Sequence, residues 1–206
     1  MPCVPTPSVK IVSAEFVTSA GKASECPPGS RVEIAVSGRS NVGKSSLMNT
    51  LFRRKNLVKV SSTPGKTQRL NYFLVNDGFH VVDLPGYGFA QAPESVRDQW
   101  RRMMQEYLRT RQQLAAVIQL VDSRHEPSRE DLEMVKWLVT EQLPFCLVAS
   151  KIDKLSQTKR PPALRAITNA LGLPATQPLV PYSSETGEGR TELLAWMDRT
   201  LEAASG

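Results

Sequence analysis

The chain has 206 residues, which is enough for one well-packed domain and too little for two of ordinary size. Hydrophobic residues make up 40% and charged residues 22%, so the composition excludes a largely disordered protein, and no apolar run approaches the ~20 residues of a membrane-spanning helix. The formal net charge is +6, and a basic protein of this size often binds a polyanion.

The N-terminal segment Met1–Pro7 has neither the apolar core of a signal peptide nor the Arg-rich pattern of a transit peptide. The three cysteines are widely spaced and fit neither a disulfide framework nor a zinc site, so we expect a reducing, cytoplasmic location. We expect residues 1–30 to form an N-terminal extension, partly disordered, with a possible edge strand at Val9–Thr18. Residues 31–203 would form the main domain.

From residue 31 onward, predicted strands alternate with predicted helices. In chain order, the pattern predicts strand Arg31–Ser37, helix Gly43–Phe52, strands Tyr72–Val75 and Phe79–Leu84 around the turn Asn76-Asp77-Gly78, helix Val96–Arg109, strand Leu114–Asp122, helix Ser128–Glu141 with Ser128 as N-cap, strand Pro144–Ser150, helix Ala163–Leu171, strand Gln177–Tyr182 and helix Thr191–Leu201. The order indicates an α/β fold whose mostly parallel, six-stranded sheet has one antiparallel edge strand and helices on both faces. Ligands bind such sheets at the C-terminal ends of the strands.

The segment Gly38-Arg39-Ser40-Asn41-Val42-Gly43-Lys44-Ser45 joins a predicted strand to a predicted helix, as a phosphate-binding loop does. Its glycines let successive backbone N–H groups face one phosphate at the helix N-terminus. Lys44 would reach the β- and γ-phosphates, and the Ser45 hydroxyl would bind Mg²⁺. The motif predicts phosphate binding and does not identify the base.

Asp83-Leu84-Pro85-Gly86 ends another predicted strand, where Asp83 could hold a Mg²⁺-bound water and the Gly86 N–H could meet the γ-phosphate. Alone, such a turn is common.

Ser150-Lys151-Ile152-Asp153 follows a third strand. Guanine offers two donors, N1–H and N2–H₂, and one carboxylate accepts both, so Asp153 would select guanine, with the Lys151 stem beside the base. Adenine would place an acceptor against that carboxylate. Backbone N–H groups of Ser183-Ser184 could meet guanine O6. Each segment alone is equally typical of a polar turn, but their order along the chain favours a guanine-nucleotide site.

With these motifs in order, the chain resembles the TRAFAC-class GTPases, and more closely the EngB (YihA/YsxC) family of bacterial ribosome-biogenesis GTPases. The resemblance rests on Gly38–Ser46, on Thr63–Gln68 before Asn71-Tyr72-Phe73, and on Val82–Ala90, whose LPGYGFA run is specific to that family. It covers roughly Val9 to Leu201. It implies a P-loop GTPase (Ras-like) three-layer sandwich with a GTP-binding domain at residues 31–203.

The resemblance also implies ligands and roles. GTP or GDP would contact Gly38, Arg39, Ser40, Asn41, Val42, Gly43, Lys44, Ser45, Ser46, Gly65, Lys66, Thr67, Gln68, Asp83, Leu84, Pro85, Gly86, Ser150, Lys151, Asp153, Tyr182, Ser183 and Ser184. Mg²⁺ would be held by Ser45 and Thr67, and by Asp83 through water. Lys44, Asn41, Thr67 and Gly86 would serve hydrolysis. The implied function is assistance in assembling the large ribosomal subunit, with a link to cell division and septation.

Two departures from the general GTPase pattern bear on activity. Ser150 stands where that pattern has Asn, and Ser is too short to bridge both the base and the loop at Gly38–Ser45. Tyr87 stands where many GTPases have a water-orienting Gln, so we expect slow intrinsic hydrolysis, raised by ribosomal particles. In related GTPases with Asn at the position of Asn41, its side chain holds K⁺ near the phosphates, so K⁺ stimulation is a hypothesis. Alternatively, Asn41 only suits the turn geometry.

The segment Arg53–Arg69 contains six basic residues and no acidic one, and it spans the predicted switch loop, so we expect it to contact ribosomal RNA in the GTP state. A plain solvated surface is the alternative, and we favour that reading for the arginines between Arg97 and Arg111. We expect a monomer that binds neither DNA nor membranes. The competing function is a guanine-nucleotide-dependent RNA-binding module with incidental hydrolysis. The SKID segment argues against an ATPase or small-molecule kinase.

Overall fold

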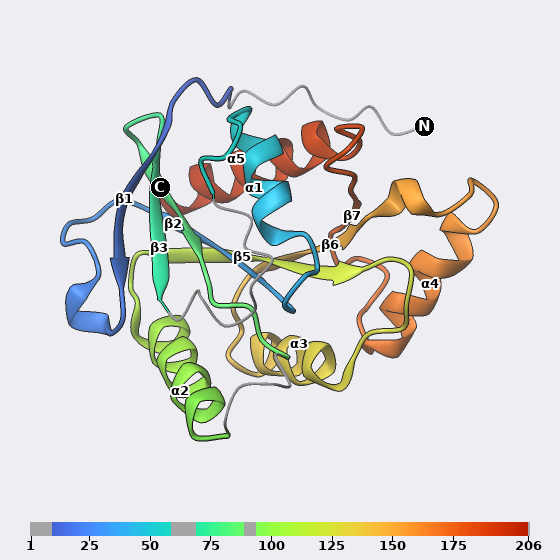
Figure 1. The fold of residues 1–206 in the computed structure, drawn as a ribbon, viewed down its shortest axis with the longest axis horizontal. Helices are drawn as coiled ribbons and strands as arrows, with labels where there is room; N and C mark the ends of the chain where they lie inside the picture. The colour runs from blue at the N-terminus through green and yellow to red at the C-terminus, as the bar shows by residue number, and fades with distance from the viewer. Residues whose placement is uncertain (1–9, 59–68, 89–93, 206) are drawn as a thin grey trace.

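A seven-stranded sheet in the order β1-β3-β4-β2-β5-β6-β7 forms the centre of the molecule (Figure 1). The computed structural model describes residues 10–58, 69–88 and 94–205. The strands are β1 (Ala14–Ala20), β2 (Glu33–Gly38), β3 (Leu70–Val75), β4 (Phe79–Asp83), β5 (Leu114–Asp122), β6 (Phe145–Ser150) and β7 (Leu179–Pro181). The helices are α1 (Lys44–Phe52), α2 (Glu94–Thr110), α3 (Arg129–Thr140), α4 (Arg160–Ala170) and α5 (Arg190–Ser205), with 3₁₀ turns η1 (Ala23–Glu25) and η2 (Ile152–Lys154). In these ranges, no helix is long and apolar enough to cross a bilayer.

The predicted α/β fold is confirmed, with one strand more than the six expected. Strands β4, β2, β5, β6 and β7 are parallel, and β2 and β6 are buried along their whole length because helices cover both faces of the sheet. The additional strand is β1, which overlaps the possible edge strand predicted at Val9–Thr18 and pairs antiparallel with β3 at the edge of the sheet. As a result β3, the antiparallel strand, lies one place inside the edge. The predicted boundary at residue 30 stays a prediction.

The hairpin predicted at Asn76-Asp77-Gly78 is confirmed between β3 and β4. Asn76 and Asp77 have φ values of 50° and 53°, the left-handed pair that a tight hairpin turn needs and that Asn and Asp tolerate best. The Asn76 side chain has a second role. Its Oδ1 accepts hydrogen bonds from the backbone N–H groups of Val12 and Ser13, and its Nδ2 donates to the Lys10 carbonyl. The turn thereby fixes the chain that leads into β1.

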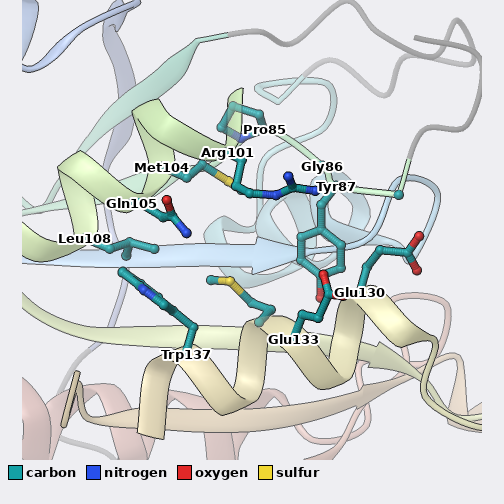
Figure 2. Close-up of a pocket in the computed structure, with 12 residues that line it drawn as sticks. Pro85, Gly86, Tyr87, Arg101, Met104, Gln105, Leu108, Glu130, Glu133 and Trp137 are labelled. Carbon is teal, nitrogen blue, oxygen red and sulfur yellow. The ribbon is translucent and has the colours of Figure 1, made fainter. Parts of the chain in front are cut away.

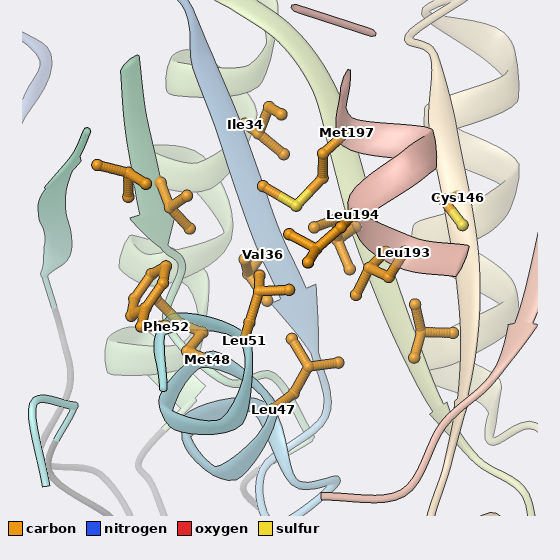
Figure 3. Close-up of a cluster of buried hydrophobic side chains, with 14 of the residues drawn as sticks. Ile34, Val36, Leu47, Met48, Leu51, Phe52, Cys146, Leu193, Leu194 and Met197 are labelled. Atoms are coloured by element: carbon orange, nitrogen blue, oxygen red, sulfur yellow. The ribbon is translucent and has the colours of Figure 1, made fainter. Parts of the chain in front are cut away.

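The helices form a layer on each face of the sheet (Figure 1). Helices α1 and α5 cover one face, where Leu47 and Leu51 of α1 and Leu193 of α5 pack with Val36 of β2 in a fully buried cluster (Figure 3). Helices α2 and α3 cover the other face with a second apolar cluster. Because both faces are sealed by apolar contacts, polar side chains can gather only at the ends of the strands.

Helix α2 is fastened to the sheet by a buried polar cluster at the end opposite the predicted ligand site. Glu33, at the start of β2, is fully buried. Its carboxylate accepts a 2.8 Å hydrogen bond from the Tyr107 hydroxyl and bonds of 3.0 and 2.6 Å from Arg111. Arg111 is therefore a structural partner of Glu33 and belongs to no surface patch, because a buried carboxylate needs such compensation.

Candidate nucleotide-binding site

The C-terminal ends of four parallel strands bring the predicted motifs to one edge of the sheet. Asp83 pairs with Val36 in the β2–β4 register, and Gly38 pairs with Leu120 in the β2–β5 register. Asp122 at the end of β5 lies opposite Ser150 at the end of β6. The strand register alone therefore places residues from distant parts of the chain around one concave edge.

The loop at Gly38–Ser45, called the P-loop below, leads directly from β2 into α1. Asn41 has φ 65° and Gly43 has φ 107°, so the loop passes through the left-handed region twice. Asn is among the few residues with a side chain that adopt this region readily. Gly43 is the N-cap of α1, and no side chain caps the helix there. The free N–H groups of the first turn are therefore available to a phosphate.

Lys44 and Asp83 face each other across this loop. The Lys44 ammonium forms an ion pair with Asp83 Oδ1, and both side chains are largely buried, with 11% and 4% of their area exposed. Asn71 of β3 donates to the other Asp83 oxygen at 3.4 Å. The charge that would meet a phosphate and the carboxylate that would serve a cation are thus brought together, each compensating the other.

Ser150, the last residue of β6, and Lys151, the next residue, both bind the backbone of the P-loop. The Ser150 hydroxyl donates to the Val42 carbonyl at 2.7 Å and lies 3.0 Å from the Val121 carbonyl. Lys151 Nζ donates to the Asn41 carbonyl at 2.8 Å. Ser150 therefore reaches the P-loop despite its short side chain, and a hydroxyl with a single proton has no donor left for a base.

Asp122 holds Lys151 in place. Its carboxylate accepts a 2.9 Å bond from Lys151 Nζ and two bonds, at 2.9 and 2.8 Å, from the Arg124 guanidinium. Burial alone would raise the pKa of Asp122, but the bonds from Arg124 and Lys151 outweigh it and hold that pKa well below its usual range. These three side chains line, with Asn41, a cavity of about 360 Å³ beside the P-loop.

Asp153 lies in η2, next to the loop that follows β7. A hydrogen bond from the Ser183 side chain lowers the pKa of Asp153, so the group is a carboxylate at neutral pH. Ser183 is fully buried, and its oxygen accepts the backbone N–H groups of Glu185 and Thr186 at 3.2 Å. The Ile152 N–H donates to the Tyr182 carbonyl at 3.1 Å, which joins the two loops. The predicted base-recognition residues are thus adjacent.

Comparison of the chain with known proteins identifies its family. Residues 33–151 match the family model described as 50S ribosome-binding GTPase. A probable GTP-binding protein EngB from Pelotomaculum thermopropionicum is 50% identical over 191 residues, covering 93% of this chain and 96% of that protein. The EngB protein of Bacillus subtilis is 44% identical over 188 residues, covering 91% and 95%. This chain belongs to the EngB family of GTP-binding proteins.

A solved structure supports the fold independently. The crystal structure of a probable GTP-binding protein EngB superposes with a TM-score of 0.71 at 20% identity, covering 84% of this chain and all of that one. This superposition confirms the predicted fold, and the relatives described above confirm the EngB-family resemblance that the sequence motifs indicated.

Four predicted nucleotide-contact residues lie in a part of the chain that the structure does not describe. Gly65, Lys66, Thr67 and Gln68 lie outside the described residues. Sequence reasoning in turn missed three residues that organise the site: Asp122, Arg124 and Asn71. The position of Asp122 at the end of a buried strand, level with Ser150, was the available signal.

We expect Asp122→Asn to lower the free energy of unfolding by about 2 kcal/mol at neutral pH, the scale of hydrogen bonds to a charged group. Because the folded pKa is depressed, the wild-type advantage is complete above about pH 4, where the unfolded carboxyl is ionised, and is lost as the pH falls toward the folded pKa. Urea denaturation of both proteins from about pH 7 to about pH 2 measures this difference. A gap that stays constant over that range would contradict the assignment.

Proposed function

We propose that this protein is a GTP-binding and GTP-hydrolysing switch that assists assembly of the large ribosomal subunit. The observation that carries the proposal is that two other segments of the chain contact the P-loop. Asp83 pairs with Lys44 of the loop, and Lys151 donates to the Asn41 carbonyl of the loop. The first pair is suited to phosphates and a cation, and the second joins the loop to the Asp153 segment. Membership of the EngB family supports the same reading.

The donor set fits Mg²⁺. Ser45 supplies a hydroxyl in the first turn of α1, and Asp83 supplies a buried carboxylate whose partners are Lys44 and Asn71. Hard oxygen donors of this kind are the ligands that Mg²⁺ takes, together with phosphate oxygens. We propose Ser45, Asp83 (through water) and Thr67 as its ligands. Bound there, the ion would neutralise charge on the phosphates.

Base selection is assigned to Asp153. Its ionised side chain is 13% exposed, and Lys154 Nζ lies 3.1 Å from Asp153 Oδ2. An unmatched base would place an acceptor against this poorly solvated carboxylate. Ser183 and Ser184 lie beside it, and the Ser184 carbonyl accepts from the Thr50 hydroxyl at 3.3 Å, which anchors this loop to α1. We propose that Tyr182, Ser183 and Ser184 complete the guanine pocket.

Asp153→Asn should lower GTP affinity roughly tenfold to a hundredfold, because the amide N–H₂ would oppose guanine N2–H₂. Xanthine carries an acceptor at C2, so the variant should gain affinity for xanthosine triphosphate over the wild type. Titration with both nucleotides measures the exchange of preference. Asp77→Asn, an exposed change in the β3–β4 turn, is the matched control. A variant that kept full GTP affinity would refute the role of Asp153.

We further propose that the Asn41 carboxamide holds K⁺ beside the phosphates. Asn41 is exposed, and its carbonyl is held by Lys151, which leaves the side chain free to face a ligand. The alternative is that Asn serves only the left-handed turn, and its φ of 65° makes a substitution to Ala a poor test because Ala strains that turn. Glycine keeps the turn and removes the amide.

Wild-type hydrolysis should then be about tenfold faster in K⁺ than in Na⁺, by the added positive charge near the transition state. Asn41→Gly should hydrolyse GTP at the same low rate in both salts while still binding GDP. Single-turnover assays in matched chloride salts give the comparison. If Asn41→Gly kept the K⁺ effect, the carboxamide would have no part in it.

The ribosomal surface is assigned to the basic segment that begins at the end of α1. Arg53, Arg54 and Lys55 are exposed, and none of them forms an ion pair with another described residue. Two arginines of α2 differ, since Arg101 pairs with Asp98 and Arg109 with Glu141. An unpaired cation can neutralise an RNA phosphate, and so release the counterion of that phosphate, without first breaking an ion pair. This favours the segment Arg53–Arg69 as the contact. Lys59 and Lys66 of that segment lie outside the described residues.

Replacing Arg53, Arg54 and Lys55 together by Ala should weaken GTP-dependent cosedimentation with large-subunit particles. It should also flatten its salt dependence, by a slope of about 0.7–0.9 for each RNA phosphate that the variant no longer neutralises. Replacing Arg101, Arg102 and Arg109 by Ala changes the charge equally on the α2 face and should have little effect. Equal binding of the GTP and GDP forms, at several salt concentrations, would refute the switch.

Single-turnover hydrolysis with and without these particles separates a stimulated GTPase from an RNA-binding module with incidental turnover. The proposal extends to cytoplasmic action as a monomer and to the link with cell division and septation that the family resemblance implies.

A further inference from the structure

The side chain of Tyr87, the residue after Gly86, is partly exposed, and its hydroxyl reaches two residues of the interior. In Figure 2 its ring lies between the Pro85–Gly86 turn and the N-terminal end of α3. The Tyr87 hydroxyl donates to Asp131 Oδ1 at 2.7 Å and accepts from Gln119 Nε2 at 2.6 Å. Burial, with Asp131 adding to it, raises the pKa of Tyr87 well above its ordinary range, so the phenol stays protonated. Its one proton is therefore committed to Asp131.

Both partners of the Tyr87 hydroxyl belong to rigid elements. Gln119 is fully buried in β5, and Asp131 is buried in the first turn of α3. The second Asp131 oxygen accepts the Ser128 backbone N–H at 2.9 Å, while the Ser128 hydroxyl accepts the Asp131 N–H at 3.3 Å. This is a capping box, so the carboxylate that receives Tyr87 also fixes the start of α3.

The backbone of the same turn lies directly on the P-loop. The Tyr87 carbonyl accepts the Ser40 N–H at 2.8 Å. A Cβ at Gly86 would lie 3.2 Å from both N and Cα of Ser40, and a Cβ at Gly88, where φ is 73°, would lie 2.7 Å from Arg39 Cγ. A side chain at either position would force these neighbours to shift, so glycine favours this close approach of the turn to the P-loop.

We infer that Tyr87 is a positioning residue that holds the Gly86 backbone against the P-loop, through hydrogen bonds to Gln119 in β5 and Asp131 in α3. The inference rests on the proposed function, in which the Gly86 N–H meets the γ-phosphate. It also explains how the position of a water-orienting glutamine can carry a tyrosine. The side chain acts from the interior on the turn and makes no contact with the attacking water.

Tyr87→Phe removes the hydroxyl and keeps the ring, so the turn should lose its anchor without losing its packing. Affinity for a non-hydrolysable GTP analogue should fall about tenfold, the effect of one or two hydrogen bonds, because binding must then also order Gly86. Affinity for GDP, which has no γ-phosphate, should stay unchanged. Titration of each purified full-length protein with both nucleotides gives the ratio of affinities.

Tyr107→Phe is the matched control, since Tyr107 is a buried tyrosine whose hydroxyl also donates to a carboxylate, that of Glu33, at 2.8 Å. It should lower the melting temperature and leave the ratio of affinities as in the wild type. Asp131→Asn provides a second route to the same bond. If both residues act through one hydrogen bond, the double variant with Tyr87→Phe should shift the ratio no further than one change does.

An unchanged ratio in Tyr87→Phe, or an equal loss for both nucleotides, would overturn the inference. A wild-type protein that binds no guanine nucleotide would instead refute the proposed function, so the two failures are distinguishable.

Discussion

The candidate site depends on the two hydrogen bonds that hold the P-loop backbone from the side of β6. A loop that passes twice through the left-handed region is costly to fix, yet its N–H groups bind phosphate only when they are fixed. The Ser150 hydroxyl fixes the Val42 carbonyl, and Lys151 Nζ fixes the Asn41 carbonyl. Because a trans peptide places C=O and N–H on opposite sides, the first bond also turns the Gly43 N–H away from β6. The SKID segment thus holds the P-loop backbone, in addition to the base recognition proposed for Asp153.

The other side of the P-loop is held by backbone contacts rather than side chains. Gly86 and Gly88 allow the turn after β4 to lie against Ser40 and Arg39, and the hydroxyl of Tyr87 between them is hydrogen-bonded to Asp131. This gives the Gly-Tyr-Gly part of the LPGYGFA run a physical meaning. The two glycines allow the backbone to lie close to the P-loop, and the tyrosine between them anchors that backbone to the interior.

Local patterns were enough to predict much of this molecule, and long-range side-chain pairs were not predictable. Strand Leu114–Asp122 was predicted to the residue, because a buried parallel strand reads as a continuous apolar run. The Ser128 cap and the Asn76 turn followed from residue types that favour those geometries. In contrast, the pair of Arg111 with Glu33 joins residues 78 apart in sequence. A local pattern contains no record of such a partner.

Within the site, too, local sequence patterns did not identify partners that are distant in the sequence. Tyr87 was identified correctly as a departure from the glutamine pattern, but its partners Asp131 and Gln119 lie 44 and 32 residues away. The edge strand was predicted as a possibility at Val9–Thr18, and β1 forms at Ala14–Ala20, because pairing with β3 fixes its bounds more than its own weakly apolar sequence does.

The ion pair between Lys44 and Asp83 would have to be broken or compensated when a ligand binds at this site. Both groups are largely buried, so removing either partner would leave the other as an uncompensated charge. When Lys44 turns to a phosphate, Asp83 retains only the 3.4 Å bond from Asn71. A divalent cation at Ser45 and Asp83 would restore the missing compensation. Under the proposed function, phosphate and cation therefore bind cooperatively, because each relieves the cost that the other creates. Under that proposal, Lys44 and Asp83 would exchange their mutual ion pair for one partner each, a phosphate and a cation, and this exchange would couple the two ligands.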